Sequence, residues 1–210
     1  MTTIPPDRLQ QALLRQDLPS FIAKAMATLE PGTPYDENWH VLHLAGQLNR
    51  VRAGELRRLM VNLPPRSLKS HIVSIAYVAW LLGHDPGKRI ICITYGQELA
   101  RQQAALFRRL VESPWYRALF PACVPAKPNR LLDWTTTRGG YRLATSIDGS
   151  ILGRGADLIA ERVQRVVESL AVPQELDQAC HAAGGDHPQR DAGREGDDLE
   201  MAPSCHGPEE

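Results

Sequence analysis

The sequence predicts an α/β fold in which a parallel sheet is flanked by helices. Two short apolar runs, residues 59–63 and 89–95, have the length and composition of buried strands. Between them, apolar residues recur at helical spacing up to a turn that begins at Gly83. A strand, a helix and a second strand with short connections imply the right-handed crossover that joins parallel strands.

The charge of the chain divides it into parts of different character. Residues 1–160 hold 20 Lys and Arg against 12 Asp and Glu, whereas residues 161–210 hold 4 against 12 and contain no aromatic residue. Such an acidic segment buries too little apolar surface to fold alone. We therefore expect an N-terminal helical segment (1–55), an α/β domain (56–160) and a disordered, unrelated tail (161–210).

Residues 1–55 are predicted to be helical. An amphipathic segment that begins at Asp7 is expected to break at Pro19 and to resume through Leu29. A further helix is expected to be capped by Asn38 and to end at Gly54.

Beyond the second strand, four more elements are predicted. Residues 97–111 form a helix that Pro114 halts, and residues 131–137 and 141–146 form a pair of strands joined by a glycine turn. A last strand is expected to stop at Ala160.

Lys69 and Ser70 are expected to open the helix that follows the first strand. A helix start presents unpaired N–H groups and the positive end of the helix dipole, so it suits phosphate. Lys-Ser at this place ends a P-loop, in which the ammonium reaches the β- and γ-phosphates and the hydroxyl ligates Mg²⁺. The two glycines of that motif would fall at Leu63 and Leu68. The same residues also fit a helix that is capped by Ser67 and leaves Lys69 solvated.

Residues 61–70 read Val-Asn-Leu-Pro-Pro-Arg-Ser-Leu-Lys-Ser. This stretch resembles the degenerate Walker A motif of the large terminase subunits of tailed bacteriophages, Asn-x-Pro-Pro-Arg-x-Gly-Lys-Ser. Only the second glycine departs, because Leu68 stands in its place. If that position needs a left-handed backbone, leucine costs about 1–2 kcal/mol there.

The resemblance implies part of an ATP-driven DNA-packaging motor with ATP and Mg²⁺ as cofactors. It makes Ser70 the Mg²⁺ ligand and Arg66 a catalytic residue that supplies transition-state charge. The family's Tyr-x-x-x-Trp-His segment makes Trp39 and Gln47 candidate contacts to the base, although a core Trp39 and a surface Gln47 fit the sequence as well. The implied nucleotide-binding set is Pro65, Arg66, Ser67, Leu68, Lys69, Ser70, Trp39 and Gln47.

A second block, residues 149–159, reads Gly-Ser-Ile-Leu-Gly-Arg-Gly-Ala-Asp-Leu-Ile. It resembles the family segment that leads into the Walker B strand, whose terminal carboxylates coordinate Mg²⁺ and polarise the attacking water. Here Glu161 follows too short a strand to reach the phosphates, so we assign no Walker B carboxylate. The resemblance spans residues 35–159 and covers neither the rest of the ATPase sheet nor the nuclease domain.

We interpret the chain as the N-terminal ATPase part of a phage or prophage large terminase, truncated before Walker B, which binds nucleotide at best and does not turn it over. The implied partners are double-stranded DNA, the portal and the small terminase subunit, in the cytoplasm of a bacterial host. No apolar run reaches the roughly 20 residues of a membrane span, and the four cysteines lack the spacing of a zinc site, so neither a membrane nor a bound zinc ion is expected.

Two other functions also fit. A non-catalytic, basic α/β module would hold DNA or a partner subunit through a basic face, which is made of Arg101, Arg108, Arg109 and Arg117. Solvated helix charges have the same appearance in a sequence. A helicase-like translocase shares the P-loop but not the blocks after residue 95.

We expect residues 161–210 to be translated out of frame, because charge balance, aromatic content and family resemblance all change within a few residues of Ala160. Translation of the gene in the +1 frame from codon 161 should give a Trp-containing helix and then a strand of the Ile-Ile-Leu-Val type, as in terminases. The possible codons of residues 164–167 and 185–188 permit both. Early stop codons, or a product without that helix and strand, would show that the tail is genuine.

Overall fold

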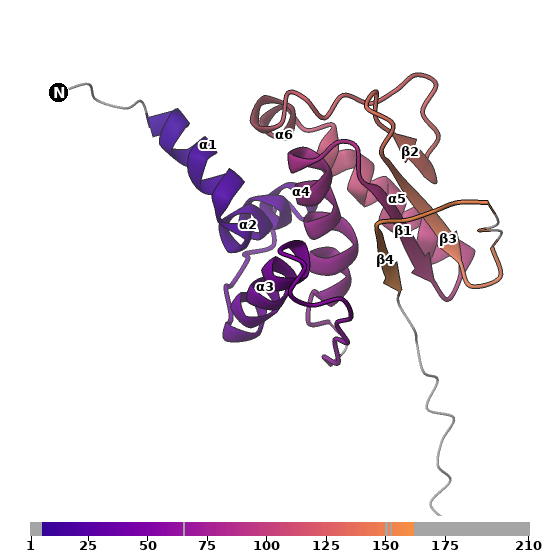
Figure 1. Ribbon diagram of the computed structural model, residues 1–210. Coiled ribbons are helices and arrows are strands. Elements are labelled where there is room, and N and C mark those ends of the chain that lie inside the picture. The colour runs from indigo at the N-terminus through magenta and orange to yellow at the C-terminus, as the bar shows by residue number, and fades with distance from the viewer. Residues whose placement is uncertain (1–5, 65, 150, 152, 162–210) are drawn as a thin grey trace, which may run out of the picture. The chain divides into compact units, whose positions relative to one another are not determined.

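The computed structural model describes residues 6–64, 66–149, 151 and 153–161 (Figure 1). All of them belong to one unit, residues 1–164. Apart from Glu161, the predicted tail lies outside the described residues, so its disorder stays a prediction.

The described helices follow the sequence pattern with two differences: α6 (Pro114–Leu119) was not predicted, and Asn38 stands at the N-cap of its helix but makes no side-chain cap hydrogen bond. None of the described helices is both long and apolar enough to cross a membrane. They are α1 (Pro6–Gln16), α2 (Leu18–Leu29), α3 (Trp39–Arg52), the π-helical segment η1 (His71–Ala76), which continues into α4 (Tyr77–His84), α5 (Gln97–Val111) and α6 (Pro114–Leu119).

The break between α1 and α2 falls at Asp17, not at Pro19 as predicted. The side chain of Asp17 caps α2 by accepting a hydrogen bond from the backbone N–H of Ser20 at 2.8 Å. Pro19 lies in the first turn of α2, where a residue without an N–H leaves no helical hydrogen bond unmade. The proline therefore starts a helix here.

Four strands form one mixed sheet in the order β2-β3-β1-β4. β1 (Arg89–Thr94) runs parallel to both β3 (Tyr141–Ser146) and β4 (Leu158–Glu161). β2 (Asp133–Thr135) pairs antiparallel with β3 through the predicted glycine turn, in which Gly139 has φ +83°. The α/β class with a sheet and flanking helices is thus confirmed.

Residues 59–63, predicted to be the first strand, belong to no strand of this sheet. Their alternation is real, because Leu59, Val61 and Leu63 pack against the core whereas Met60 is 85 % exposed. A strand also needs a neighbour with free backbone groups, and periodicity fixes which side chains face inward without supplying that neighbour. The prediction of a strand there was wrong for this reason.

The helices pack on one face of the sheet. Residues opposite each other on neighbouring strands share a face, and the register places Cys92 beside Ala144 on one side and Ala160 on the other. Ala100 and Ala104 of α5 pack against Ala144. Cys92 and Ala160 join the core that includes η1 and α4.

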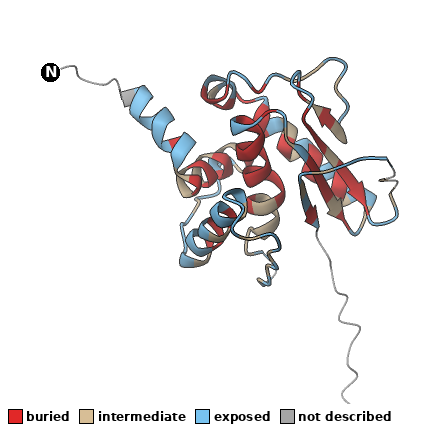
Figure 2. Cartoon of the chain, viewed as in Figure 1, coloured by how far each residue is buried: buried red, intermediate tan, exposed pale blue. Residues whose placement is uncertain are grey.

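Of the described helices, α4 is the most deeply buried, and residues 77–83 are all buried (Figure 2). A helix that is apolar all round has to be covered on every side. The polar atoms of two α4 side chains bond to other helices. Tyr77 Oη donates to the carbonyl oxygen of Leu48 at 2.9 Å, and Trp80 Nε1 donates to that of Leu14 at 3.2 Å. These bonds tie α3 and α1 to α4.

His84, the last residue of α4, has an unusual environment for an ionisable group. Its Nε2 lies 2.9 Å from the carbonyl oxygen of Arg15, and its ring packs edge-on against Trp80 and Phe120. His84 is exposed at the surface, but the contacts of its ring with Trp80 and Phe120 remove part of its hydration, and this desolvation, with the nearby charge of Arg52, lowers the pKa of His84. Folding therefore favours the neutral ring.

Acidification should destabilise the protein through His84. At pH values between the lowered pKa of His84 and its ordinary value of about 6.5, the unfolded chain binds more protons than the folded protein. The stabilisation that comes from keeping the His84 ring neutral is complete above about pH 6.5, and it is lost as the pH falls through the lowered pKa. In thermal denaturation, His84→Gln should lose less Tm than the wild type between about pH 7.5 and about pH 5. The control His43→Gln replaces another exposed histidine and should lose as much Tm as the wild type, and an equal loss in His84→Gln would contradict the assignment.

Candidate functional site

The loop before η1 has an unusual backbone. Arg66 has φ +65° and Leu68 has φ +58°, both in the left-handed region that favours glycine. Pro65, between the segment 59–64 and this loop, lies outside the described residues. At Leu68, where the sequence comparison expected a glycine, the backbone has the conformation that a glycine would adopt without strain.

The helix begins at Lys69 and Ser70, as predicted. Its backbone is continued by Ile72, whose N–H donates to the carbonyl oxygen of Leu68 at 2.9 Å. Ser67 does not cap the helix: its hydroxyl donates to the carbonyl oxygen of Pro64 at 2.8 Å. Ser70, the residue before η1, makes no cap hydrogen bond with its side chain, so the N–H groups at this start are open to an anion.

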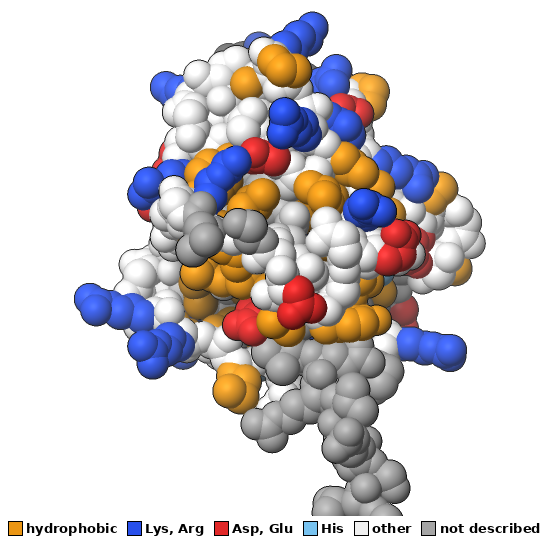
Figure 3. All heavy atoms as spheres, turned by 90° about the vertical axis from the view of Figure 1, so that its right-hand side faces the viewer, with side chains coloured by type: hydrophobic (Ala, Val, Ile, Leu, Met, Phe, Trp, Pro, Cys, Tyr) orange, Lys and Arg blue, Asp and Glu red, His pale blue; other side chains and the backbone are white. Residues whose placement is uncertain are grey.

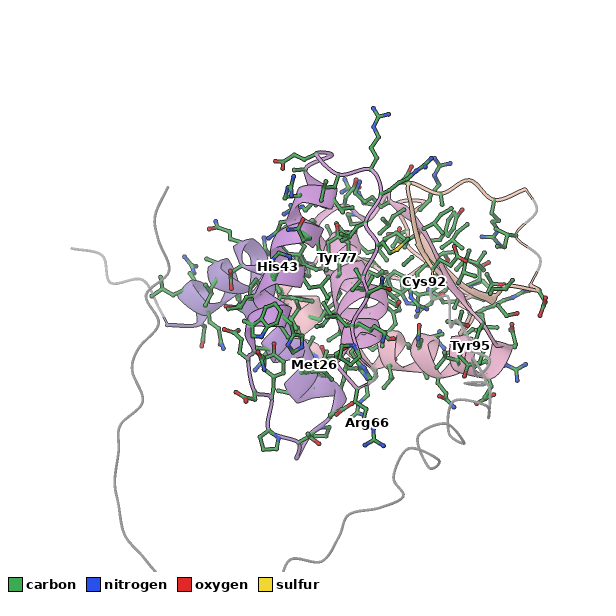
Figure 4. All side chains as sticks on the ribbon, turned by 90° about the horizontal axis from the view of Figure 1, so that it is seen from below. Met26, His43, Arg66, Tyr77, Cys92 and Tyr95 are labelled. Atoms are coloured by element: carbon green, nitrogen blue, oxygen red, sulfur yellow. The ribbon has the colours of Figure 1, made fainter. Side chains whose placement is uncertain are left out.

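The ammonium of Lys69 folds back on the loop. Its Nζ donates to the carbonyl oxygen of Leu63 at 2.7 Å and to that of Pro64 at 3.3 Å. The side chain is therefore held by carbonyl dipoles, not by a carboxylate. Arg66 is exposed and extends from the loop away from the helices (Figure 4).

A hollow of about 330 Å³ adjoins the loop and is lined by residues of α3 and of the segment 59–63. Trp39 lies on its wall and is 75 % exposed, so the alternative of a core tryptophan is wrong. Gln47 also lines the hollow, is half-buried, and accepts a hydrogen bond from Arg50 Nη1 at 3.1 Å. Leu63 belongs to both features, because it lines the hollow and its carbonyl oxygen accepts from Lys69.

The second sequence block, residues 149–159, stabilises the starting ends of the strands; Ser150 and Leu152 in it lie outside the described residues. Arg154 pairs with Asp133 at 2.6 Å, and Asp157 pairs with Arg89 at 3.2 Å. The hydrogen bond from the Arg89 side chain lowers the pKa of Asp157. The helix from residue 69 to residue 84 is about 24 Å long and ends just before β1, so this block lies far from the loop.

Glu161 is part of β4, so the strand is one residue longer than predicted. It pairs in register with Ile93, the last but one residue of β1, and its side chain is exposed. Among the described residues, no three His, Cys, Asp or Glu side chains form a group that could hold a metal ion.

The proposed basic face is partly used by the fold. Arg108 Nη2 donates to the carbonyl oxygen of Asn129 at 3.0 Å, and Arg109 Nη1 donates to that of Leu29 at 3.2 Å. Arg101 remains exposed, as does Arg117. On the face that Figure 3 shows, Lys and Arg side chains are scattered among apolar, neutral and acidic ones.

No protein-family model matches the chain, and no curated protein matches it.

Sequence reasoning did not find three features of this site. The left-handed Arg66 gave no signal, because arginine has no preference for that conformation. The contact of 3.4 Å between His71 Nε2 and Glu30 Oε1 joins residues far apart in the chain. The exposed Met60 on the wall of the hollow could have been found from the alternation of residues 59–63, which turns its side chain outward.

A matched pair of variants tests the backbone at Leu68. Both Leu68→Gly and Leu68→Ala remove the half-buried side chain, but only glycine adopts φ +58° without strain. Alanine is ordinarily the more stable of the two by about 0.5–1 kcal/mol in regular structure. At this position we expect the reverse order, with the glycine variant more stable by about 0.5–1 kcal/mol in urea denaturation. An alanine variant of equal or greater stability would contradict the left-handed backbone.

Proposed function

We propose that this chain is the N-terminal ATPase part of a large terminase subunit from a tailed phage or prophage, and that its loop binds Mg-ATP with negligible turnover. The nucleotide-binding residues would be the loop set 65–70 together with Trp39 and Gln47. The partners that this proposal implies are double-stranded DNA, the portal and the small subunit, in the cytoplasm of the bacterial host.

One observation carries the proposal: Leu68 is left-handed at the place where a P-loop has its second glycine. A leucine costs about 1–2 kcal/mol in that conformation. The loop has this unfavourable conformation at Leu68, and in the helix that follows, Ser70 makes no side-chain cap hydrogen bond. A helix that merely began after a proline turn would need neither feature.

The residues present fit the phosphates of a nucleotide better than they fit its metal ion. The uncapped helix start and the ammonium of Lys69 suit the charge and the acceptor atoms of phosphate. For Mg²⁺ the loop offers the hydroxyl of Ser70. In the described part of the chain, no group of three or more His, Cys, Asp or Glu side chains could hold a metal ion. Magnesium commonly keeps waters and substrate phosphates as its other ligands.

The proposed roles follow from these positions. Lys69 would exchange the carbonyl oxygens of Leu63 and Pro64 for the β- and γ-phosphates, and Ser70 would hold the metal ion, which supplies neutralisation of phosphate charge. Arg66 is free to turn toward the same phosphates, because it is exposed at the loop. Since no Walker B carboxylate is assigned, activation of a water molecule has no base in this proposal.

The alternative, a non-catalytic basic module that holds DNA or a partner, has less support. Two of its four arginines, Arg108 and Arg109, already donate to backbone carbonyl groups. The remaining exposed pair, Arg101 and Arg117, supplies few of the phosphate contacts that DNA affinity requires.

Nucleotide-dependent stabilisation tests the proposal. At a Mg-ATP concentration about tenfold above its Kd, binding should add about 1.4 kcal/mol. For a chain of this size the Tm should then rise by about 3–6 °C. Lys69→Ala should abolish the rise, whereas the exposed control Lys127→Ala should retain it, and phosphate release should stay at background. A rise of equal size in Lys69→Ala would refute the site.

A further inference from the structure

The helix behind the loop changes its register within its first turns. Ile72 N–H donates to Leu68, four residues back, whereas Tyr77 N–H donates to Ile72, five residues back. The intervening segment η1 is π-helical over His71–Ala76. One extra residue in a helical turn rotates the residues before that turn by about 100° about the helix axis, relative to a regular α-helix. The segment η1 therefore sets the direction in which Lys69 faces.

Two side chains from the sheet meet the carbonyl oxygen of Ser74 in the middle of η1. Arg142 Nη2 of β3 donates to it at 3.5 Å, and the thiol of Cys92 on β1 lies 3.9 Å away. Figure 4 shows Cys92 in the interior, between the sheet and the helices. Side chains that reach into a helical ladder are a recognised cause of local irregularity. The contacts of Arg142 and Cys92 with Ser74 therefore fall within the π-helical segment η1.

Arg142 is fully buried, and its charge is poorly compensated. Its Cζ lies 4.7 Å from the centre of the Phe107 ring, but Nε and Nη1 have no hydrogen-bond partner among the described residues. No salt bridge within the described residues includes it. Burying a charge in this way is unfavourable, and replacing such a group by an apolar side chain is often neutral or stabilising. Stability alone does not account for the contact with Ser74.

We propose that Arg142 is a positioning residue for the phosphate loop: through the carbonyl oxygen of Ser74 it holds η1 in the π-helical register, and η1 aims Lys69 and Ser70. The part that concerns nucleotide rests on the proposed function, whereas the part that concerns η1 does not. The guanidinium of Arg142 thus connects β3 to the middle of η1, four residues after Ser70.

Four full-length proteins test this: wild type, Arg142→Met, Arg142→Lys and the control Arg108→Met. Arg108 also donates to a backbone carbonyl oxygen, that of Asn129, but it lies on α5, is only half-buried and pairs with Glu112. Amide hydrogen exchange of Tyr77 is measured without ligand, and Mg-ATP affinity and Tm are measured alongside. In Arg142→Met the Tyr77 amide should exchange at least about tenfold faster and Mg-ATP affinity should fall about tenfold, while Tm stays equal or rises. Arg142→Lys should restore part of both losses, and Arg108→Met should show neither.

The outcomes separate the two proposals. A Tyr77 amide that exchanges in Arg142→Met at the wild-type rate, or more slowly, overturns the positioning role whatever the nucleotide result. A variant that loses affinity only in proportion to a lowered Tm also overturns it, because a merely structural role predicts that pattern. Faster exchange together with a wild type that does not bind Mg-ATP supports the hold on η1 and rejects the proposed function alone.

Discussion

The burial of α4 on every side is the constraint on which the rest of the structure depends. An all-apolar helix is stable in water only when other elements cover it. Here α2 and α5 pack against α4, and α1, α3 and α6 are joined to it by hydrogen bonds. Buried polar groups then need partners, and Tyr116 Oη meets the carbonyl oxygen of Ala79 at 2.7 Å, as Tyr77 meets Leu48. Burial raises the pKa of Tyr77 to about 12, so this hydroxyl stays a donor. The helix is thereby fixed, and the loop at its start is fixed with it.

A fixed helix allows unfavourable local structure to persist at its beginning. The left-handed Arg66 and Leu68, the π-helical η1 and the buried Arg142 each cost free energy, and all of them lie on the path from the sheet to Lys69. Local strain survives only where the surroundings over-determine the conformation. Its concentration around one helix start is the physical argument for a site there. Elsewhere in the described helices the backbone is regular.

The two sequence blocks, residues 61–70 and residues 149–159, have different physical roles. The first shapes the loop and the helix start. The second is bound to the opposite end of the sheet, where Arg154 and Asp157 form ion pairs and the hydroxyl of Tyr141 donates to the carbonyl group of Gly155. It connects β3 to the start of β4, which pairs with β1, so its residues act by placing a strand and not by contacting the loop.

The sequence by itself determined the elements whose side chains follow a clear period: residues 97–111 as a helix, residues 141–146 as a strand, and the helix start at Lys69. In these, local spacing and burial specify the same structure. Tertiary structure alone decided that residues 59–63 pair with no strand and that Trp39 is exposed beside the loop. The reason is physical: a period records which side of a segment turns inward, whereas hydrogen-bond partners, the solvent exposure of a single side chain and a left-handed φ depend on neighbours that are distant in the chain.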